Sequence, residues 1–334
     1  MSDHEDQPQP RPGVFGLADR LRMLTHHDHG HESPLADTGA AGVRASKVSL
    51  VGLATTAALQ AVLVVLTGSV ALLSDTLHNL TDALTAIPLW IAFSLGRRSS
   101  SRRFTFGLGR AEDLAGLVVV TAIAVSAGGV AWESIRRLLE PRPLDHIPWV
   151  VAAGLIGAVG NELVAEYRIR VGRRISSEAL LADGQHARTD ALTSLAVVAA
   201  GIGSALGADW VDPVAGLVVA GMILLLLRHA GTRVFGRILD AVDPALVDRT
   251  HDVAGSVPGV ASVGDIRMRW HGHRMLITLT AAVDSDLTVR QGHQIAETIS
   301  HDLIHAFPFS AEALVHIDPR GEAGAHDVTA HHNR

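Results

Sequence analysis

The chain has 334 residues, of which 48% are hydrophobic, 4% aromatic and 19% charged, and its mean hydropathy is +0.27. This mean hydropathy is too high for an ordinary soluble domain and too low for a chain wholly immersed in lipid, so it indicates a membrane portion averaged with a polar one. A net charge of −6 argues against non-specific binding to nucleic acid, which needs a basic surface. The chain has 19 His and no Cys, which excludes disulfides and thiolate sites, so any soft-metal chemistry depends on imidazole and carboxylate.

Residues 1–43 are polar and are predicted to form a disordered tail. They contain no apolar core, which argues against a cleavable secretory signal. Four histidines cluster in this tail, at His26, His27, His29 and His31. Such a cluster either collects metal ions near the entrance of a membrane domain or is a solvated segment of little consequence, and the sequence leaves both readings open.

Residues 44–231 contain the apolar runs that could cross a bilayer, for which a helix needs about 18–20 residues. Three charge-free runs reach that length, namely 48–74, 114–132 and 191–208. Three shorter apolar runs lie at 83–96, 147–161 and 213–227. The second segment reaches full length if it includes the ionisable residues that precede it, and the fifth is lengthened in the same way from about Ala179. The sequence therefore predicts six transmembrane helices.

Basic residues are concentrated before the first predicted helix, between the second and third, after the fourth and after the sixth. With six helices, all of these positions fall on one side of the membrane. The positive-inside rule makes that side cytoplasmic. We therefore expect a multi-pass protein of the cell (plasma or inner) membrane with both termini in the cytoplasm. The exceptions are Arg136, Arg137 and Arg142, which are partly offset by Glu133, Glu140 and Asp145.

The pattern changes in residues 232–320. The segment 244–257 has the periodicity of a short amphipathic helix, and alternating apolar residues from Met275 to Val283 are typical of a strand. Helical periodicity over 288–307 and a short strand at 314–317 complete the order helix, strand, strand, helix, strand. This order predicts a small α+β domain, followed by a disordered tail in residues 321–334.

One motif, D-x-x-H-x-x-x-D, occurs twice, each time at the entry to an apolar helix. The copies are Asp75, His78 and Asp82 in the second predicted helix and Asp183, His186 and Asp190 in the fifth. Offsets of three and seven residues place the three side chains on one face of a helix. Because ionisable residues inside a membrane helix are costly, the repeated set indicates a functional site.

The depth of the two copies supports a shared site. The two helices run in opposite directions, and a rise of about 1.5 Å per residue brings both His-x-x-x-Asp pairs near the middle of a core of about 30 Å. His78, Asp82, His186 and Asp190 would then form an N₂O₂ set suited to tetrahedral Zn²⁺. Co²⁺ or Cd²⁺ could also fit, whereas Mg²⁺ and Ca²⁺ prefer all-oxygen sites. The alternative is a polar network that only ties two helices together.

The remaining members of the motif, Asp75 and Asp183, are expected to orient the liganding histidines as carboxylates outside the ligand set. Helix capping or water contacts are the competing role for them.

These motifs resemble the cation diffusion facilitators, a family of zinc-type divalent cation/proton antiporters. The resemblance covers residues 44–320 and also rests on G-S-V-A-L-L-S-D at 68–75, F-T-F-G-L-G-R-A-E at 104–112 and V-H-I-D-P at 315–319. It implies six membrane helices, a ferredoxin-like cytoplasmic domain, a homodimer, and a transport site formed by His78, Asp82, His186 and Asp190. It also implies that divalent metal ions, protons and the lipid bilayer are the partners, with Zn²⁺ as substrate and no cofactor.

The resemblance also implies a candidate cytoplasmic metal site, because His293, His316 and Asp318 match ligand positions of the family. Gly264 and Thr280 stand at further ligand positions and cannot bind zinc through comparable side chains. We interpret the site either as a regulatory zinc site, in which His271 and His273 are the nearest substitutes, or as surface histidines.

The predicted function is proton-coupled efflux of a divalent metal by alternating access, with Zn²⁺ as the expected metal and Co²⁺, Cd²⁺, Fe²⁺ or Mn²⁺ as alternatives. Metal ligands must be deprotonated, and imidazoles with a reference pKa of about 6.5 let protons compete with the metal. Two other classes are a membrane-anchored metal sensor, which needs no duplicated ligands, and a membrane metalloprotease, for which the H-E-x-x-H motif is missing. The chain is thus predicted to be a transporter rather than an enzyme.

Overall fold

The computed structural model describes residues 34–67, 76, 79–80, 84, 86–140, 147–208, 210–307 and 309–321. The predicted tails, over 1–33 and 322–334, and the first motif copy, Asp75, His78 and Asp82, lie outside the described residues.

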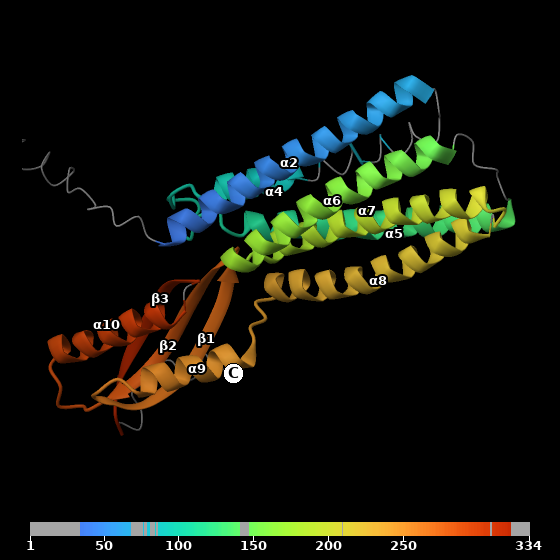
Figure 1. The fold of residues 1–334 in the computed structure, drawn as a ribbon. Coiled ribbons are helices and arrows are strands. Elements are labelled where there is room, and N and C mark those ends of the chain that lie inside the picture. The colour runs from blue at the N-terminus through green and yellow to red at the C-terminus, as the bar shows by residue number, and fades with distance from the viewer. Residues whose placement is uncertain are drawn as a thin grey trace, which may run out of the picture. The chain divides into compact units, whose positions relative to one another are not determined.

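The first part of the described chain is built of long helices that lie side by side (Figure 1). They are α2 (Pro34–Thr67), α4 (Ala86–Gly96), α5 (Ala111–Leu139), α6 (Ile147–Ile175), α7 (Glu178–Ala205) and α8 (Val211–Ile238). Buried apolar side chains of α4, α5, α7 and α8 form one core, in which Leu89, Ile123 and Leu180 are fully buried. Leu53 of α2 packs against Val164 of α6, which attaches α2 to the other helices.

Several of these helices could cross a membrane. Within the described part of the chain, four are long and apolar enough to do so, namely α2 (over Thr38–Leu66), α5, α6 and α8. The apolar helix α4 is shorter, with 11 residues, and most residues just before Ala86 lie outside the described ranges. The remaining helix, α7, has 28 residues and carries the charged residues Glu178, Asp183, Arg188 and Asp190. These helices agree with the predicted helical membrane domain.

Two helices extend past the predicted limits of the membrane domain at residues 44 and 231. The first, α2, begins at Pro34, and proline is a common residue in the first turn of a helix. The last, α8, continues to Ile238 through Arg233 and Arg237. Charges end an apolar run but not a helix, because long basic side chains can keep their charged ends in water. Hydropathy therefore marks the membrane core rather than the helix ends.

The second part of the described chain is an α+β domain, as predicted. Its elements are α9 (Pro244–Gly255), β1 (Val260–His271), β2 (Arg274–Val283), α10 (Val289–Ala306) and β3 (Ser310–Pro319). The sheet order is β1-β2-β3, in which β1 and β2 form an antiparallel hairpin and β2 and β3 are parallel, joined through α10. Along the chain, the element order αββαβ is that of a ferredoxin-like fold without its first strand.

The predicted alternation of β2 is confirmed by its burial. Met275, Ile277, Leu279, Ala281 and Val283 are all buried, while the residues between them are more accessible. They share a core with Ala254 of α9 and with Ile299 and Leu303 of α10, so both helices contribute to covering the sheet (Figure 1).

Candidate metal centre

The turn between α6 and α7 fixes the start of the second motif copy. Ser176 has a φ of 57° and ends α6, with hydrogen bonds from Ser176 N to Arg173 O (3.4 Å) and from Ser177 N to Gly172 O (2.9 Å). These two bonds are those of a Schellman C-cap. Ser177 then caps α7, because its Oγ accepts from Leu180 N at 3.1 Å. The two helices are therefore joined by a turn of only two residues and run antiparallel.

The second motif copy lies inside the helical core. Asp183, His186 and Asp190 are 0%, 1% and 5% exposed, and they share one face of α7 as their spacing predicts. Nδ1 of His186 is 3.9 Å from Oδ1 of Asp190. This imidazole and this carboxylate can supply one nitrogen and one oxygen ligand from the same helix.

The third member of that copy has a partner on the neighbouring helix. Arg168 of α6 is 1% exposed, and its Nε lies 3.1 Å from Oδ2 of Asp183. Its Nη1 also donates to the backbone oxygen of Asp183 at 3.3 Å. The helices approach closely here, since a Cβ on Gly184 would lie 2.8 Å from Cγ1 of Ile169. Asp183 is thus part of a buried ion pair between α6 and α7.

The first motif copy is represented by a neighbour of its histidine. Asn79, next to His78 in the sequence, is buried and donates to Oε1 of Gln60 in α2 at 2.6 Å. Asn161 of α6 donates to Oδ1 of Asn79 at 3.4 Å, and Gln60 donates to the backbone oxygen of Ala153 at 3.2 Å. This buried amide network links residue 79 to α2 and α6. Where His78, Asp82 and Asp75 lie with respect to His186 and Asp190 is outside the described residues.

Charged residues on the outer side of α6 and α7 form a separate cluster. Arg188 donates to Glu162 (2.7 Å) and to Glu166 (2.9 Å), and Arg170 donates to Glu166 (2.7 Å). These side chains are between 36% and 76% exposed, in contrast to His186 and Asp190. Glu162 and Glu166 are therefore engaged in ion pairs on the surface of the helical part, away from the motif face of α7.

The candidate site of the α+β domain is only partly assembled. Nε2 of His316 is 3.1 Å from Oδ1 of Asp318 on β3, while His293 is an exposed residue of α10. Thr280 is the register partner of His316, and a Cβ on Gly264 would overlap Oγ1 of Thr280. The matched positions therefore form a row across the sheet, but two of them carry no metal ligand. Over all the residues that the structure describes, no group of three or more His, Cys, Asp or Glu could hold a metal ion.

His271 and His273, the candidate substitute zinc ligands, contact the helical part instead. They flank Gly272 (φ 64°) in the turn of the β1–β2 hairpin. Nε2 of His271 accepts from the backbone N–H of Gly109 at 3.0 Å. Burial, followed by the charges of Arg110, Arg269 and Arg274, lowers the pKa of His271 below its usual value. His271 is therefore held as a neutral imidazole.

The second histidine of the turn contacts two helices. Nδ1 of His273 is 2.7 Å from Oε2 of Glu112 in α5, and Nε2 is 3.0 Å from Oγ1 of Thr38 in α2. A third helix, α8, reaches the turn through Arg237, whose Nη1 donates to Gly272 O at 3.0 Å. We call this arrangement, formed by residues 271–273 with Thr38, Gly109, Glu112 and Arg237, the hairpin seat. The only sequence signal for it is a glycine between two histidines at the junction of two strands.

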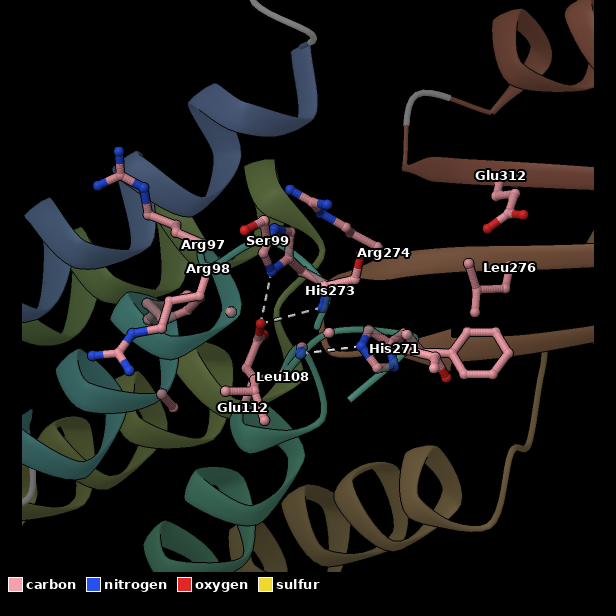
Figure 2. A pocket seen from close by; sticks show the side chains of 18 residues that line it. Arg97, Arg98, Ser99, Leu108, Glu112, His271, His273, Arg274, Leu276 and Glu312 are labelled. Atoms are coloured by element: carbon pink, nitrogen blue, oxygen red, sulfur yellow. Dashed lines mark hydrogen bonds and ion pairs between the residues drawn. The ribbon is translucent and has the colours of Figure 1, made fainter. Parts of the chain in front are cut away.

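A cavity of about 480 Å³ lies beside the hairpin seat (Figure 2). Glu112 and His273 point toward one another at its centre, and His271 reaches the backbone of the segment before α5. The rim includes Arg97, Arg274 and the exposed Glu312. Among the described residues that line this cavity, the His and Glu side chains are not arranged as a metal-ligand set.

Comparison with known proteins identifies both parts of the chain. Residues 46–234 match the family model described as "Cation efflux transmembrane domain", and residues 242–320 match "Cation efflux protein, cytoplasmic domain". The chain is 50% identical over 300 residues to the probable cation efflux system protein Rv2025c of Mycobacterium tuberculosis, covering 89% of this chain and 90% of that protein. It is 27% identical over 259 residues to the manganese efflux system protein MneP of Bacillus subtilis, covering 75% and 87%. A solved MamM C-terminal domain is 27% identical with a TM-score of 0.23, covering 23% of this chain and 98% of that one.

Proposed function

We propose that this chain, which belongs to the cation efflux family, exports Zn²⁺ in exchange for protons. Its family makes it a multi-pass membrane transporter of divalent cations, not an enzyme, and its C-terminal domain is cytoplasmic. The choice of Zn²⁺, the coupling to protons and the metal ligands go beyond the family.

One observation carries the assignment of the site. His186 and Asp190 are buried together on one face of α7, although a buried imidazole and a buried carboxylate are costly inside a membrane domain. The same three residue types recur at the same spacing at positions 75, 78 and 82. A repeated N/O ligand pair is what a tetrahedral site between two helices requires. We infer that His78 and Asp82 complete the site with His186 and Asp190.

The ligand types favour Zn²⁺. Two imidazoles and two carboxylates suit zinc, whereas Mn²⁺ is better served by carboxylate, carbonyl and water oxygens. One relative is named as a manganese efflux protein, so the metal has to be decided by direct competition. The complete absence of Cys fits a transported metal, because thiolates would hold zinc too tightly for rapid release.

The same residues account for the coupling to protons. His and Asp bind a metal only when deprotonated, so loading Zn²⁺ from the cytoplasm displaces protons from the site. When the site opens to the other side, protons from outside compete with the metal for the same atoms. Alternating access of one site thus gives exchange of metal for protons.

We infer the remaining architecture from the charge pattern and the family. Both termini lie in the cytoplasm of a cell that carries the protein in its plasma or inner membrane. The membrane domain corresponds to about residues 44–231 and the cytoplasmic domain to about 232–320, with polar tails at both ends. The working unit is a homodimer, which the family's cytoplasmic domain supports.

Metal flux into proteoliposomes of the purified full-length chain tests the proposal. We expect Zn²⁺ uptake that follows an imposed pH gradient and is lost in His186→Ala and Asp190→Asn. Matched controls are His229→Ala, an exposed histidine of α8, and Asp265→Asn, an exposed carboxylate of β1; both should transport normally. Competition by Mn²⁺, Co²⁺, Cd²⁺ and Fe²⁺ ranks the metals. Zn²⁺ flux that does not depend on the pH gradient, or that persists in Asp190→Asn, would contradict the mechanism.

A further inference from the structure

The buried ion pair between Arg168 and Asp183 is not explained by metal binding. Arg168 is among the largest fully buried side chains, and it lies in a stripe of α6 otherwise formed by Asn161, Ala165 and Gly172. Its guanidinium meets the Asp183 carboxylate at 3.1 Å and the Asp183 backbone oxygen at 3.3 Å. A permanently charged guanidinium has thus been placed inside a bundle that transports cations.

This pair lies one helical turn from the proposed ligands. Asp183 precedes His186 by three residues on the same face of α7, which corresponds to about 5–6 Å between Cβ atoms. The side chains of Asp183 and His186 are both fully buried, so little water lies between them to screen a charge on one from the other. A net charge on either member of the pair would therefore act directly on a divalent ion held by His186 and Asp190.

The pair is not needed merely to hold α6 against α7. Small residues already let these helices approach closely: a Cβ on Gly172 would lie 3.1 Å from Leu181, and a Cβ on Gly157 would lie 2.8 Å from Oγ of Ser194. Buried ion pairs contribute little net stability compared with apolar side chains of similar volume. We therefore attribute the buried pair to an effect of its two charges rather than to packing of the two helices.

We propose that Arg168 is a positioning residue that draws the Asp183 carboxylate toward α6 and cancels its charge, and that this balance sets the affinity of the transport site for its metal. The inference rests on the proposed function. Without Arg168, Asp183 becomes a second uncompensated carboxylate on the motif face of α7, and the metal is held more tightly and released more slowly. Without the Asp183 charge, the guanidinium faces the site uncompensated and repels the metal.

A double-mutant series on Zn²⁺ transport in proteoliposomes separates this role from a structural one. We expect Arg168→Gln to lower KM and Vmax, and Asp183→Asn to raise KM, each KM by about threefold or more. The double variant Arg168→Gln/Asp183→Asn should return KM to within about twofold of the wild-type value. A merely structural tie would impair both single variants in the same direction, and the double variant would not recover; that result would overturn the inference.

Charge-conserving variants keep the test decisive if a neutral variant does not fold. Arg168→Lys and Asp183→Glu retain both charges while changing the geometry of the pair. We expect their KM to stay near the wild-type value, and a KM that shifts as far as in the neutral variants would contradict a role of charge. Asp190→Asn, measured in parallel, distinguishes a failure of the proposed function from a failure of the role of Arg168. If Asp190→Asn still transports, the proposed function fails; if it is inactive but the single variants shift KM alike, only the role of Arg168 fails.

Discussion

Oε2 of Glu112 lies 2.7 Å from Nδ1 of His273 and 3.2 Å from its backbone N, although the two residues are 161 positions apart in the chain. Both side chains are buried, and the same imidazole also contacts Thr38. His273 therefore connects the β1–β2 turn both to the first turn of α5 and to the beginning of α2. Through this residue the cytoplasmic domain is attached to two membrane helices at points other than the covalent link after α8.

Glu112→Ala should loosen the hairpin seat. It removes the acceptor of two His273 donors and leaves them buried, which costs about 1–3 kcal/mol. We expect a lower melting temperature of the purified transporter and faster hydrogen exchange in the backbone of residues 271–274. Glu312→Ala, at the exposed rim of the same cavity, is the matched control and should change neither quantity. Equal effects of the two substitutions would show that the contact contributes nothing specific.

The hairpin seat should weaken in acid because of His271. Its pKa in the folded chain is lowered, so the bound turn favours the neutral ring; this stability is present above the unfolded pKa of about 6.5 and is lost as the pH falls through the folded value. Protonation of Nε2 would also remove the acceptor of the Gly109 N–H. We expect hydrogen exchange of residues 271–274, corrected for intrinsic rates, to speed up toward about pH 5.5.

The control for this pH effect is His271→Gln, whose amide oxygen can accept the same hydrogen bond without titrating. Its exchange in residues 271–274 should depend less on pH than in the wild-type chain; a smaller dependence remains because burial raises the pKa of the nearby Asp113 to about 6. An unchanged pH dependence in His271→Gln would assign the effect to another group.

Much of this architecture follows from short-range patterns in the sequence. The period-two alternation from Met275 to Val283 predicts the buried strand β2, and the offsets of three and seven predict that Asp183, His186 and Asp190 share one buried face. Both predictions depend only on the local geometry of a strand or a helix, which the sequence reports directly. The same reasoning predicted the αββαβ order of the cytoplasmic domain.

Contacts between distant segments could not be predicted in the same way. Nothing near Arg168 indicates that it is buried, since arginines follow it at 170, 173 and 174 and all read as one basic segment after a helix. Its burial depends on Asp183 across the α6–α7 turn, and the hairpin seat depends on contacts between residues 161 and 162 positions apart. Hydropathy ranks arginine by its average preference for water and cannot identify the one that has a buried carboxylate as partner.

The amide network beside residue 79 should stabilise the packing of three segments. Asn161→Leu removes a donor to Asn79 and leaves a polar group without that partner inside the bundle. Hydrogen bonds between membrane helices contribute about 0.6–2 kcal/mol, so we expect a modest fall in thermal stability in detergent and slower metal transport. Thr121→Val is the control, because Thr121 is exposed and its hydroxyl donates within its own helix, to Leu117 O. A stability loss in Thr121→Val as large as in Asn161→Leu would mean that the network has no special role.

Gly184 and Gly221 should respond to alanine in opposite directions. A Cβ on Gly184 would lie 2.8 Å from Cγ1 of Ile169 and 3.1 Å from its backbone N, so Gly184→Ala must push α6 and α7 apart where Arg168 meets Asp183. Such overpacking costs about 1–3 kcal/mol. A Cβ on Gly221 in α8 would meet nothing within 4 Å, so Gly221→Ala should be neutral or gain up to about 1 kcal/mol from the better helix propensity of alanine. Melting curves in one detergent measure the change in thermal stability of each variant relative to the wild-type chain. Equal destabilisation would mean that the α6–α7 contact is not as close as described, and it would remove the geometric basis for the Arg168–Asp183 pair.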